Sequence, residues 1–449
     1  MNETNAPPDA GPPPIERDTL ATLSRPSTRY WAGLSVSIAL VVIGGIAWAL
    51  ALRRGLGLLG LNEPVMWGAL ITTFVFFIGV SHSGTLVSAI LYFTRSPLRS
   101  AIGRSAEAMT VITILTAGLY PIIHIGRSWM FFYVLPYPSQ RQLWPNFRSP
   151  LTWDVFAISS YVLVSALFLF MGMLPDLALL ARQVTGWRRP LYRFLSLGFG
   201  GTSSEWKLFE TAYPIFAAIV IPLAISVHSV VSWDFAMTVM PGWHSAIFAP
   251  YFVAGAIFSG IAMAILLLSG LRAGFGLQRY IQPAHFDLLA KILLGMSLVM
   301  TLVYGTEFYM AFFRGSETEA EIFRWRATGS YAPVFWLVVA FNSVAPLLCF
   351  WSRVRRSLPA LIAIAALVTA GMWFERFLFI VTTLAHNFDP QNWGNYVPTV
   401  PEVLICLGGF GWFAMLFLLF VKIFPSMSVA ETLQVHYASA SGRGEATHA

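Results

Sequence analysis

The amino-acid sequence predicts an all-α integral membrane protein with ten transmembrane helices. Of its 449 residues, 57% are hydrophobic and 11% are charged, whereas about 25% are charged in an ordinary soluble domain. The apolar residues form runs of about 20, the length that crosses a bilayer. The basic residues, which give a formal net charge of +7, are scattered through the connections between these runs. The composition therefore excludes a water-soluble fold and a nucleic-acid-binding surface.

Each apolar run is assigned to one transmembrane helix. The predicted helices cover residues 30–52, 65–93, 105–126, 152–174, 206–232, 246–271, 284–313, 331–352, 358–385 and 402–424. With a cytoplasmic N-terminus, 17 Lys and Arg residues fall in inner segments and 8 in outer loops. Because cytoplasmic loops carry the excess of basic residues, we expect both termini to be cytoplasmic.

A weak internal repeat divides the chain into two four-helix bundles. When helix 2 is aligned with helix 6, three small residues coincide. The pairs are Gly79 with Gly255, Ser83 with Ser259, and Gly84 with Gly260. Helices 2–5 and 6–9 would then form the bundles, with helices 1 and 10 flanking them. Small residues at this spacing also occur in any tightly packed membrane helix pair, so a chance match is the alternative.

The repeat and the composition together define six segments. Residues 1–29 are rich in proline and predict a disordered cytoplasmic tail, and residues 425–449 predict a second cytoplasmic tail. Residues 30–64 hold the first helix and an outer loop, 65–232 the first bundle, 233–385 the second bundle, and 386–424 an outer loop and the last helix. The run that begins near Trp31 is too long for a cleaved signal, so we expect it to remain as an anchor.

Two connecting loops carry distinctive residues. The inner loop from Gln183 to Ser204 contains GWRRPLYRF, a basic and aromatic stretch typical of a segment on the membrane surface. It ends in a predicted capping box, Thr202 with Glu205, which begins helix 5. The outer loop from Arg127 to Leu151 is long, aromatic and rich in proline, and it either docks a partner or only connects helices.

Several ionisable residues lie inside or at the ends of predicted membrane helices. Each costs at least about 2.5 kcal/mol on insertion scales, so each needs a partner, a water cavity or a functional role. His124, Asp154 and Asp234 share one depth near the outer face of the first bundle. His228 and Trp233 lie near Asp234 in the sequence. The second bundle contributes Glu307, Glu375 and Arg376 at somewhat greater depth.

A histidine and carboxylates facing an aromatic cavity match the needs of a quinol headgroup. Its hydroxyls need acceptors, its ring needs flat apolar walls, and its oxidation needs proton acceptors. The predicted catalytic residues are His124, Asp154 and Asp234. The predicted quinol-binding residues are these three with His228, Trp233, Glu307 and Arg376. The alternative is that Asp154 and Asp234 cap helices while His124 and Trp233 belong to the interfacial belt.

His82, within the segment SHSGT, is the deepest ionisable residue of the inner half. With Glu210 and Lys291 it is a candidate for a proton path, and the alternative is a structural hydrogen bond between helices.

No resident cofactor is expected. Cys349 and Cys406 lie far apart in apolar runs, which excludes a disulfide framework, a zinc site and an iron–sulfur cluster.

Haem and nucleotide sites are also not expected. Bis-histidine ligation of haem needs two histidines at equal depth on facing helices, whereas His82 is assigned to the inner half and His124 and His228 to the outer end. The sequence contains no Walker A motif and no HExxH zinc motif, and its single GxGxxG spacing, from Gly55 to Gly60, lies between two predicted membrane helices rather than between a strand and a helix.

Four stretches together resemble the NrfD/polysulfide-reductase membrane-subunit family. They are GVSHSGTLVSAIL, PIIHIGR, LTWDVFAISSY and HSVVSWDFAMTVMPGWHSAIFAPYFVAGAIFSG. Within that family the sequence is most similar to the quinol-oxidising membrane subunit of bacterial alternative complex III. The resemblance covers nearly all of the hydrophobic chain. It implies two four-helix bundles with flanking helices, in a bacterial inner (cytoplasmic) membrane.

The resemblance also implies a function. Menaquinol would bind near the periplasmic face, with the family's site residues falling on His124, Asp154, Asp234 and Arg376. This chain would hold no redox cofactor. Electrons would pass to an iron–sulfur protein and then to c-type haem subunits on the periplasmic side. A second NrfD-like membrane subunit and lipids would be further partners, and protons would be released outward, with or without coupled proton translocation.

Two other functions remain open at the level of sequence. A bundle repeat with buried charges is also a signature of secondary transporters, which carry broken helices at matching positions of their repeats. The sequence has glycine pairs but no clear unwound segment. The third candidate is a structural membrane anchor without quinol binding, and binding of a quinol analogue distinguishes it from a quinol-oxidising subunit.

Overall fold

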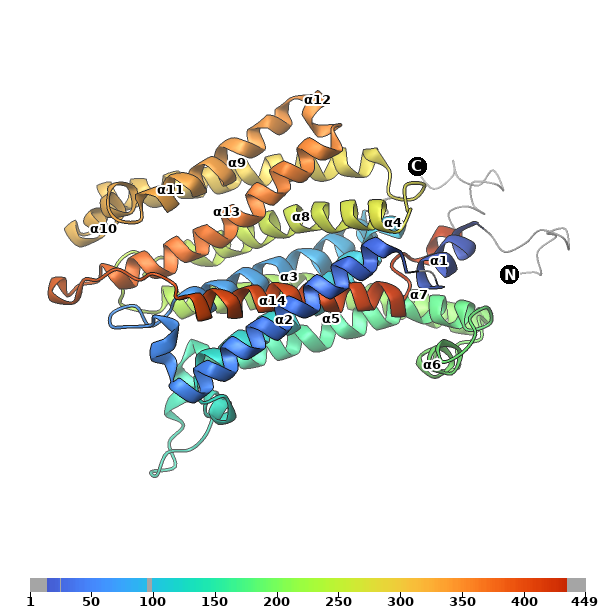
Figure 1. Ribbon diagram of the computed structural model, residues 1–449, viewed down its shortest axis with the longest axis horizontal. Helices are drawn as coiled ribbons and strands as arrows, with labels where there is room; N and C mark the ends of the chain where they lie inside the picture. The colour runs from blue at the N-terminus through green and yellow to red at the C-terminus, as the bar shows by residue number, and fades with distance from the viewer. Residues whose placement is uncertain (1–13, 25, 95–98, 434–449) are drawn as a thin grey trace, which may run out of the picture.

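The computed structural model describes residues 14–24, 26–94 and 99–433, whose long helices run along one common axis (Figure 1). Within these ranges ten helices are long and apolar enough to cross a membrane, which confirms the predicted number. They are α2 (Thr28–Arg54), α3 (Ala69–Phe93), α4 (Arg99–His124), α5 (Pro150–Leu180), α7 (Ser203–Ala236), α8 (Phe248–Gly274), α9 (Pro283–Phe313), the span Ala332–Phe350, α13 (Leu358–Ala385) and α14 (Val400–Ile423).

Shorter helices lie at the two ends of the long ones. At one end, called the α6 end below, are α1 (Pro14–Ser24) and α6 (Arg188–Leu195), and at the other, called the α10 end, is α10 (Glu317–Thr328) (Figure 1). The predicted capping box is confirmed, because Thr202 and Glu205 make both of its hydrogen bonds at the start of α7. The remaining short helices are η1 (Leu56–Leu59), η2 (Ser128–Val134), η3 (Pro145–Arg148), α12 (Ser352–Arg355) and η6 (Pro390–Asn392).

The prediction of a disordered tail over residues 1–29 is wrong for residues 14–24, which form α1. Ile15 and Leu23 of this helix are buried, and the Lys422 ammonium donates a hydrogen bond to the carbonyl of Thr22. The polar composition of the segment conceals its apolar side, which packs against α14. Residues 28 and 29 of the same predicted tail begin α2, and Ser426 and Val429 of the second predicted tail are buried. Residues 1–13, 25 and 434–449 lie outside the described residues, so the predictions for them are not tested.

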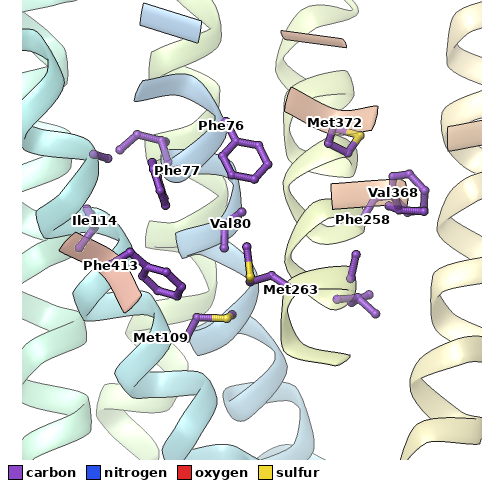
Figure 2. Close-up of a cluster of buried hydrophobic side chains, with 14 of the residues drawn as sticks. Phe76, Phe77, Val80, Met109, Ile114, Phe258, Met263, Val368, Met372 and Phe413 are labelled. Carbon is purple, nitrogen blue, oxygen red and sulfur yellow. The ribbon is translucent and has the colours of Figure 1, made fainter. Parts of the chain in front are cut away.

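The long helices form two four-helix bundles with two flanking helices. α3, α4, α5 and α7 pack as the first bundle, and α8, α9, the span Ala332–Phe350 and α13 as the second. α3 and α8 meet between them, where Phe76, Val80, Phe258 and Met263 belong to one apolar core (Figure 2). α7 continues to Ala236, so residues 233–236 belong to the first bundle, and the predicted boundary at residue 232 is too early.

The flanking helices α2 and α14 pack against each other at a glycine contact. A Cβ atom on Gly44 would lie 2.7 Å from the Cα of Gly408, so only glycine permits this approach. The first and the last membrane helices of the described chain therefore lie side by side.

The eighth span is interrupted. It begins as α11 (Ala332–Val338), continues as a π-helical turn η4 (Val339–Val344), and ends as the 3-10 helix η5 (Ala345–Phe350). Pro346 has no N–H to donate to the carbonyl of Asn342, and the Ser297 hydroxyl donates to that carbonyl instead, at 3.0 Å. The corresponding helix of the first bundle, α5, is continuous.

Candidate functional site

The first bundle encloses a cavity of about 360 Å³ at the α10 end of the molecule. Its walls come from the ends of α3, α4, α5 and α7 and from η2. The three residues predicted to be catalytic, His124, Asp154 and Asp234, all line it. The structure thus brings together side chains that come from three different helices and lie far apart in the sequence.

Helix ends position these three side chains. His124 is the last residue of α4, Asp154 lies in the second turn of α5, and Asp234 lies in the last turn of α7. Because α5 runs antiparallel to α4 and α7, the end of one helix meets the start of the next at one level. Ser149, not Asp154, is the N-cap of α5, and a carboxylate is unfavourable at a helix C-terminus. Helix capping therefore does not account for the two aspartates.

Asp154 and Asp234 interact directly. Both are buried, with 5% and 7% of their surfaces exposed, both line the same cavity, and the charge of Asp154 acts on Asp234. Two carboxyl groups that share one buried site do not readily ionise together, so one of them carries a proton. The pair can therefore hold one proton and accept a second.

Three buried polar atoms at this cavity have no hydrogen-bond partner among the described residues. They are Nδ1 of His124, Oδ1 of Asp154 and Oδ1 of Asp234. An unpaired buried polar group costs about 1–3 kcal/mol, and most such groups in proteins are paired. One imidazole nitrogen and two carboxyl oxygens are thus available to a polar ligand.

Aromatic side chains that the sequence does not single out form the apolar walls. Trp67 precedes α3 and packs edge-on against Phe235, with ring centroids 5.6 Å apart. Phe74 of α3 and Phe131 of η2 complete the aromatic lining. The available signals are that Phe235 follows Asp234 and that Trp67 comes directly before an apolar run. Both patterns are common in membrane proteins, so they do not identify these residues.

Four residues predicted to bind quinol do not line this cavity. Trp233 is 39% exposed and packs against Trp153 on the outside of the bundle. Glu307 lines a separate cavity in the second bundle, and Arg376 pairs with Glu375, Nε to Oε2, at 3.3 Å. Depth along a helix does not indicate the bundle to which a residue belongs, and for this reason the sequence groups Glu307 and Arg376 with His124.

The fourth of these residues, His228, lies against His82 in the interior. The two ring centroids are 4.7 Å apart, so the assignment of His82 and His228 to different depths is wrong. Helical side chains lean toward the N-terminus of their own helix. α3 and α7 run in opposite directions, so the two side chains lean toward each other. The ring of His82 also stacks on Tyr161 at 4.7 Å.

The other two residues of the predicted proton path are not near His82. Glu210 is exposed on α7. Lys291 is exposed on α9, and its ammonium pairs with Asp287 at 2.6 Å. The structure therefore offers His228 and Tyr161, rather than Glu210 and Lys291, as neighbours of His82.

Comparisons with known proteins place this geometry in context. The family model described as polysulphide reductase, NrfD, matches residues 57–386. A Halobacterium salinarum protein, provisionally named as a dimethyl sulfoxide reductase membrane subunit, is 27% identical, over 85% of this chain and 87% of its own length. A selenate reductase subunit of Mesobacillus selenatarsenatis is 23% identical, over 86% of this chain and 92% of its own.

A third relative comes from Archaeoglobus fulgidus. It is named Hdr-like menaquinol oxidoreductase integral membrane subunit and is 24% identical, over 91% of this chain and 97% of its own length. In the described part of the chain, no group of three or more His, Cys, Asp or Glu side chains is arranged to hold a metal ion.

Proposed function

Because the chain belongs to the NrfD/polysulphide reductase family, we propose that it is the quinol-oxidising membrane subunit of a respiratory oxidoreductase complex. The three relatives are named as membrane subunits or reductase subunits, and one name specifies a menaquinol oxidoreductase. The observation that carries the proposal is the set of unpaired buried atoms of His124, Asp154 and Asp234 in one aromatic cavity.

The cavity suits a quinol in shape and in polarity. Its volume of about 360 Å³ lies within the usual range for small-molecule sites, roughly 300–1,000 Å³. The ring would lie among Trp67, Phe74 and Phe235. The isoprenoid tail would leave between α4 and α5, where Leu151 lines the cavity and is 47% exposed.

The three polar groups supply the proton chemistry. Oxidation of one quinol to the quinone releases two protons and two electrons. One proton passes to Nδ1 of His124, and the other to the Asp154–Asp234 pair, which already holds one proton and can take a second. The electrons pass to an iron–sulfur protein docked on the α10 end, where η2 and η3 expose Phe132, Tyr133 and Phe147.

The proposal also includes the type of complex, the substrate, the partner subunits and the membrane. They are a complex of the alternative complex III type, menaquinol as the substrate, c-type haem subunits and a second NrfD-like subunit as partners, and a bacterial inner membrane. The positive-inside count supports a periplasmic α10 end with cytoplasmic termini. Coupled proton translocation would use His228, His82 and Tyr161, which lie deeper in the same bundle.

The test is quinol oxidation by the purified complex. In stopped-flow assays with a short-chain menaquinol, His124→Ala and Asp154→Asn should each lower kcat at least about 100-fold, the usual minimum contribution of a positioned proton acceptor. Glu210→Gln, on an exposed part of α7, is the matched control and should leave the rate unchanged. Normal turnover by a correctly assembled Asp154→Asn complex would refute the proposal.

The interrupted eighth span is the feature that favours the secondary-transporter alternative. That alternative requires a break at the matching position of the other repeat, and the matching helix α5 is continuous. Binding of a quinol analogue to the first cavity separates the proposal from both the transporter and the structural anchor, because neither of them requires it.

A further inference from the structure

A second cavity, of about 410 Å³, lies in the second bundle at the same end of the molecule. Its walls come from α8, α9, α10, α13 and the interrupted span. Two of its side chains, Glu307 and Glu375, are acidic, and Arg326 of α10 is basic. Residue spacing shows how this cavity is related to the first.

α4 and α9 line their cavities with residues at equal spacing. α4 contributes Gly118, Pro121, Ile122, His124 and Ile125 to the first cavity. α9 contributes Thr301, Tyr304, Gly305, Glu307 and Phe308 to the second. Each residue of the first set has a counterpart in the second set, and the number of residues that separates the two is the same for all five pairs. His124 therefore corresponds to Glu307.

α5 and the interrupted span show the same relation, again at a single offset. Leu151, Val155 and Ser159 line the first cavity. Their counterparts Phe335, Val339 and Ser343 line the second. Asp154 also has a lining counterpart at this offset, which is Val338.

The two remaining helix pairs agree. Val75 of α3 and Tyr251 of α8 correspond at the offset that aligns Gly79 with Gly255, and they line the first and second cavities respectively. Phe235 of α7 and Phe379 of α13 correspond at a different offset, which also aligns Asp234 with Leu378, and they line the first and second cavities respectively. Their rings are in contact between the bundles, with centroids 5.1 Å apart. All four helices of the first cavity therefore recur around the second.

The polar groups of the two cavities differ. Asp154 is replaced by Val338, and Asp234, at the same offset as Phe235, is replaced by Leu378. The second cavity instead has Glu375, which is 3% exposed. Its carboxylate forms an ion pair with Arg376, but its two oxygens accept no hydrogen bond from any described residue. It also has Arg326, whose Nε and Nη2 donate to Thr382 and Thr383 at 2.8 and 2.7 Å.

We propose that the second cavity is a second binding site for a quinone-type headgroup, a flat ring that carries hydroxyl or carbonyl oxygens. The choice of ligand rests on the proposed function of the first cavity, because the repeat gives both cavities one plan. Tyr304, Phe308 and Phe335 supply flat walls. Glu307 and Glu375 accept hydrogen bonds from ring hydroxyls, and Arg326 donates to a ring carbonyl. The site lacks the paired aspartates, so it binds the ring without oxidising it.

The experiment counts binding sites on the purified complex with an oxidised short-chain naphthoquinone as the probe. Gly118→Trp and Thr301→Trp fill corresponding positions of the two cavities, and a Cβ atom on Gly118 would meet no atom within 4 Å. We expect two equivalents bound by the wild-type complex, one by each variant and none by the double variant. Circular dichroism and thermal unfolding report whether each variant is folded.

The outcomes separate the two proposals. The second site is overturned, and the first stands, if the wild-type complex binds one equivalent of naphthoquinone that Gly118→Trp removes and Thr301→Trp does not. One equivalent kept in Gly118→Trp and lost in Thr301→Trp contradicts the first site and supports the second. If Thr301→Trp does not fold, Glu375→Gln with Glu307→Gln replaces it and should weaken one of two affinities at least tenfold. Two unaltered affinities would overturn the second site.

Discussion

The two bundles share one helix arrangement but differ in the residues that occupy it. In the first, α5 is continuous and the cavity carries one histidine and two aspartates. In the second, the matching span changes to a π-turn and a 3-10 helix, and the cavity carries two glutamates and an arginine. The helix arrangement thus sets the position and size of each cavity, and a few side chains set its chemistry.

The α6 ends of the two bundles differ as well. In the first bundle Arg104 pairs with Glu107 at 3.4 Å and Asp176 at 3.1 Å, and all three side chains are at most 3% exposed. In the second bundle Asp287 pairs with Lys291 at 2.6 Å and Arg355 at 3.0 Å, and these side chains are 17–55% exposed. The ion network at this end is therefore buried in the first bundle and partly exposed in the second.

The largest expected effect comes from replacing the two aspartates of the first cavity with the residues found at the corresponding positions of the second cavity. Asp154→Val together with Asp234→Leu should reduce kcat for quinol oxidation by about 100-fold to 10,000-fold, because both carboxyl proton acceptors are lost. Binding of the oxidised quinone should remain within about tenfold, because the aromatic walls are kept. Stopped-flow kinetics and equilibrium titration measure the two quantities. Equal losses in binding and turnover would mean that the aspartates hold the ligand rather than accept its protons.

The next effect is on stability and concerns the buried ion network. Arg104→Met leaves Glu107 and Asp176 buried without their cation, and breaking a buried pair in this way costs about 3–5 kcal/mol. The free energy of unfolding, measured in mixed micelles, should fall by that amount. A loss below about 1 kcal/mol, the range of exposed pairs, would show that the carboxyl groups are protonated and do not need the guanidinium.

The matched change in the second bundle should have a much smaller effect. Lys291→Met removes the exposed partner of the cluster, and exposed ion pairs contribute about 0–1 kcal/mol. The same unfolding measurement applies. A loss as large as that of Arg104→Met would eliminate the distinction between the two ends.

The smallest effect is a pH dependence in the second bundle. His386 follows α13 and stacks between Trp325 and Trp393, with ring centroids at 4.6 and 3.4 Å. Burial lowers the pKa of His386 below its ordinary value of 6.5, although Glu321 nearby opposes this shift. Below about pH 6.5 the unfolded chain binds a proton that the folded chain does not, so stability falls as the pH decreases.

His386→Gln is the variant that tests this. The midpoint of thermal unfolding, measured at about pH 7.5 and about pH 5, on either side of the ordinary histidine pKa, should fall less in the variant than in the wild type. An equal or larger fall in the variant would show that other groups cause the acid sensitivity.

The membrane spans can be predicted from sequence because hydropathy and length alone decide them. His124, Asp154 and Asp234 can be predicted to converge because each lies at one end of an apolar run, and alternating helix directions bring those ends to one level. Sequence reasoning groups Glu307 with the same site because depth does not reveal which bundle a helix joins. That information depends on packing between helices far apart in the sequence.

The remaining differences have other physical causes. Trp67 and Phe235 are typical apolar residues of a membrane protein, and only their place beside the aspartates distinguishes them. His82 and His228 meet because side chains on antiparallel helices lean in opposite directions, which residue counts along each helix do not show. α1 has the composition of a disordered tail because only two of its buried residues, Ile15 and Leu23, are apolar and its partners lie on distant parts of the chain.

The contact of Gly44 with Gly408 has a consequence for biosynthesis. α2 emerges from the ribosome first among the described membrane helices, and its partner α14 emerges last. During translation the glycine face of α2 therefore lacks its partner until α14 has been synthesised. A chain that terminates before α14 leaves the glycine face of α2 without this partner.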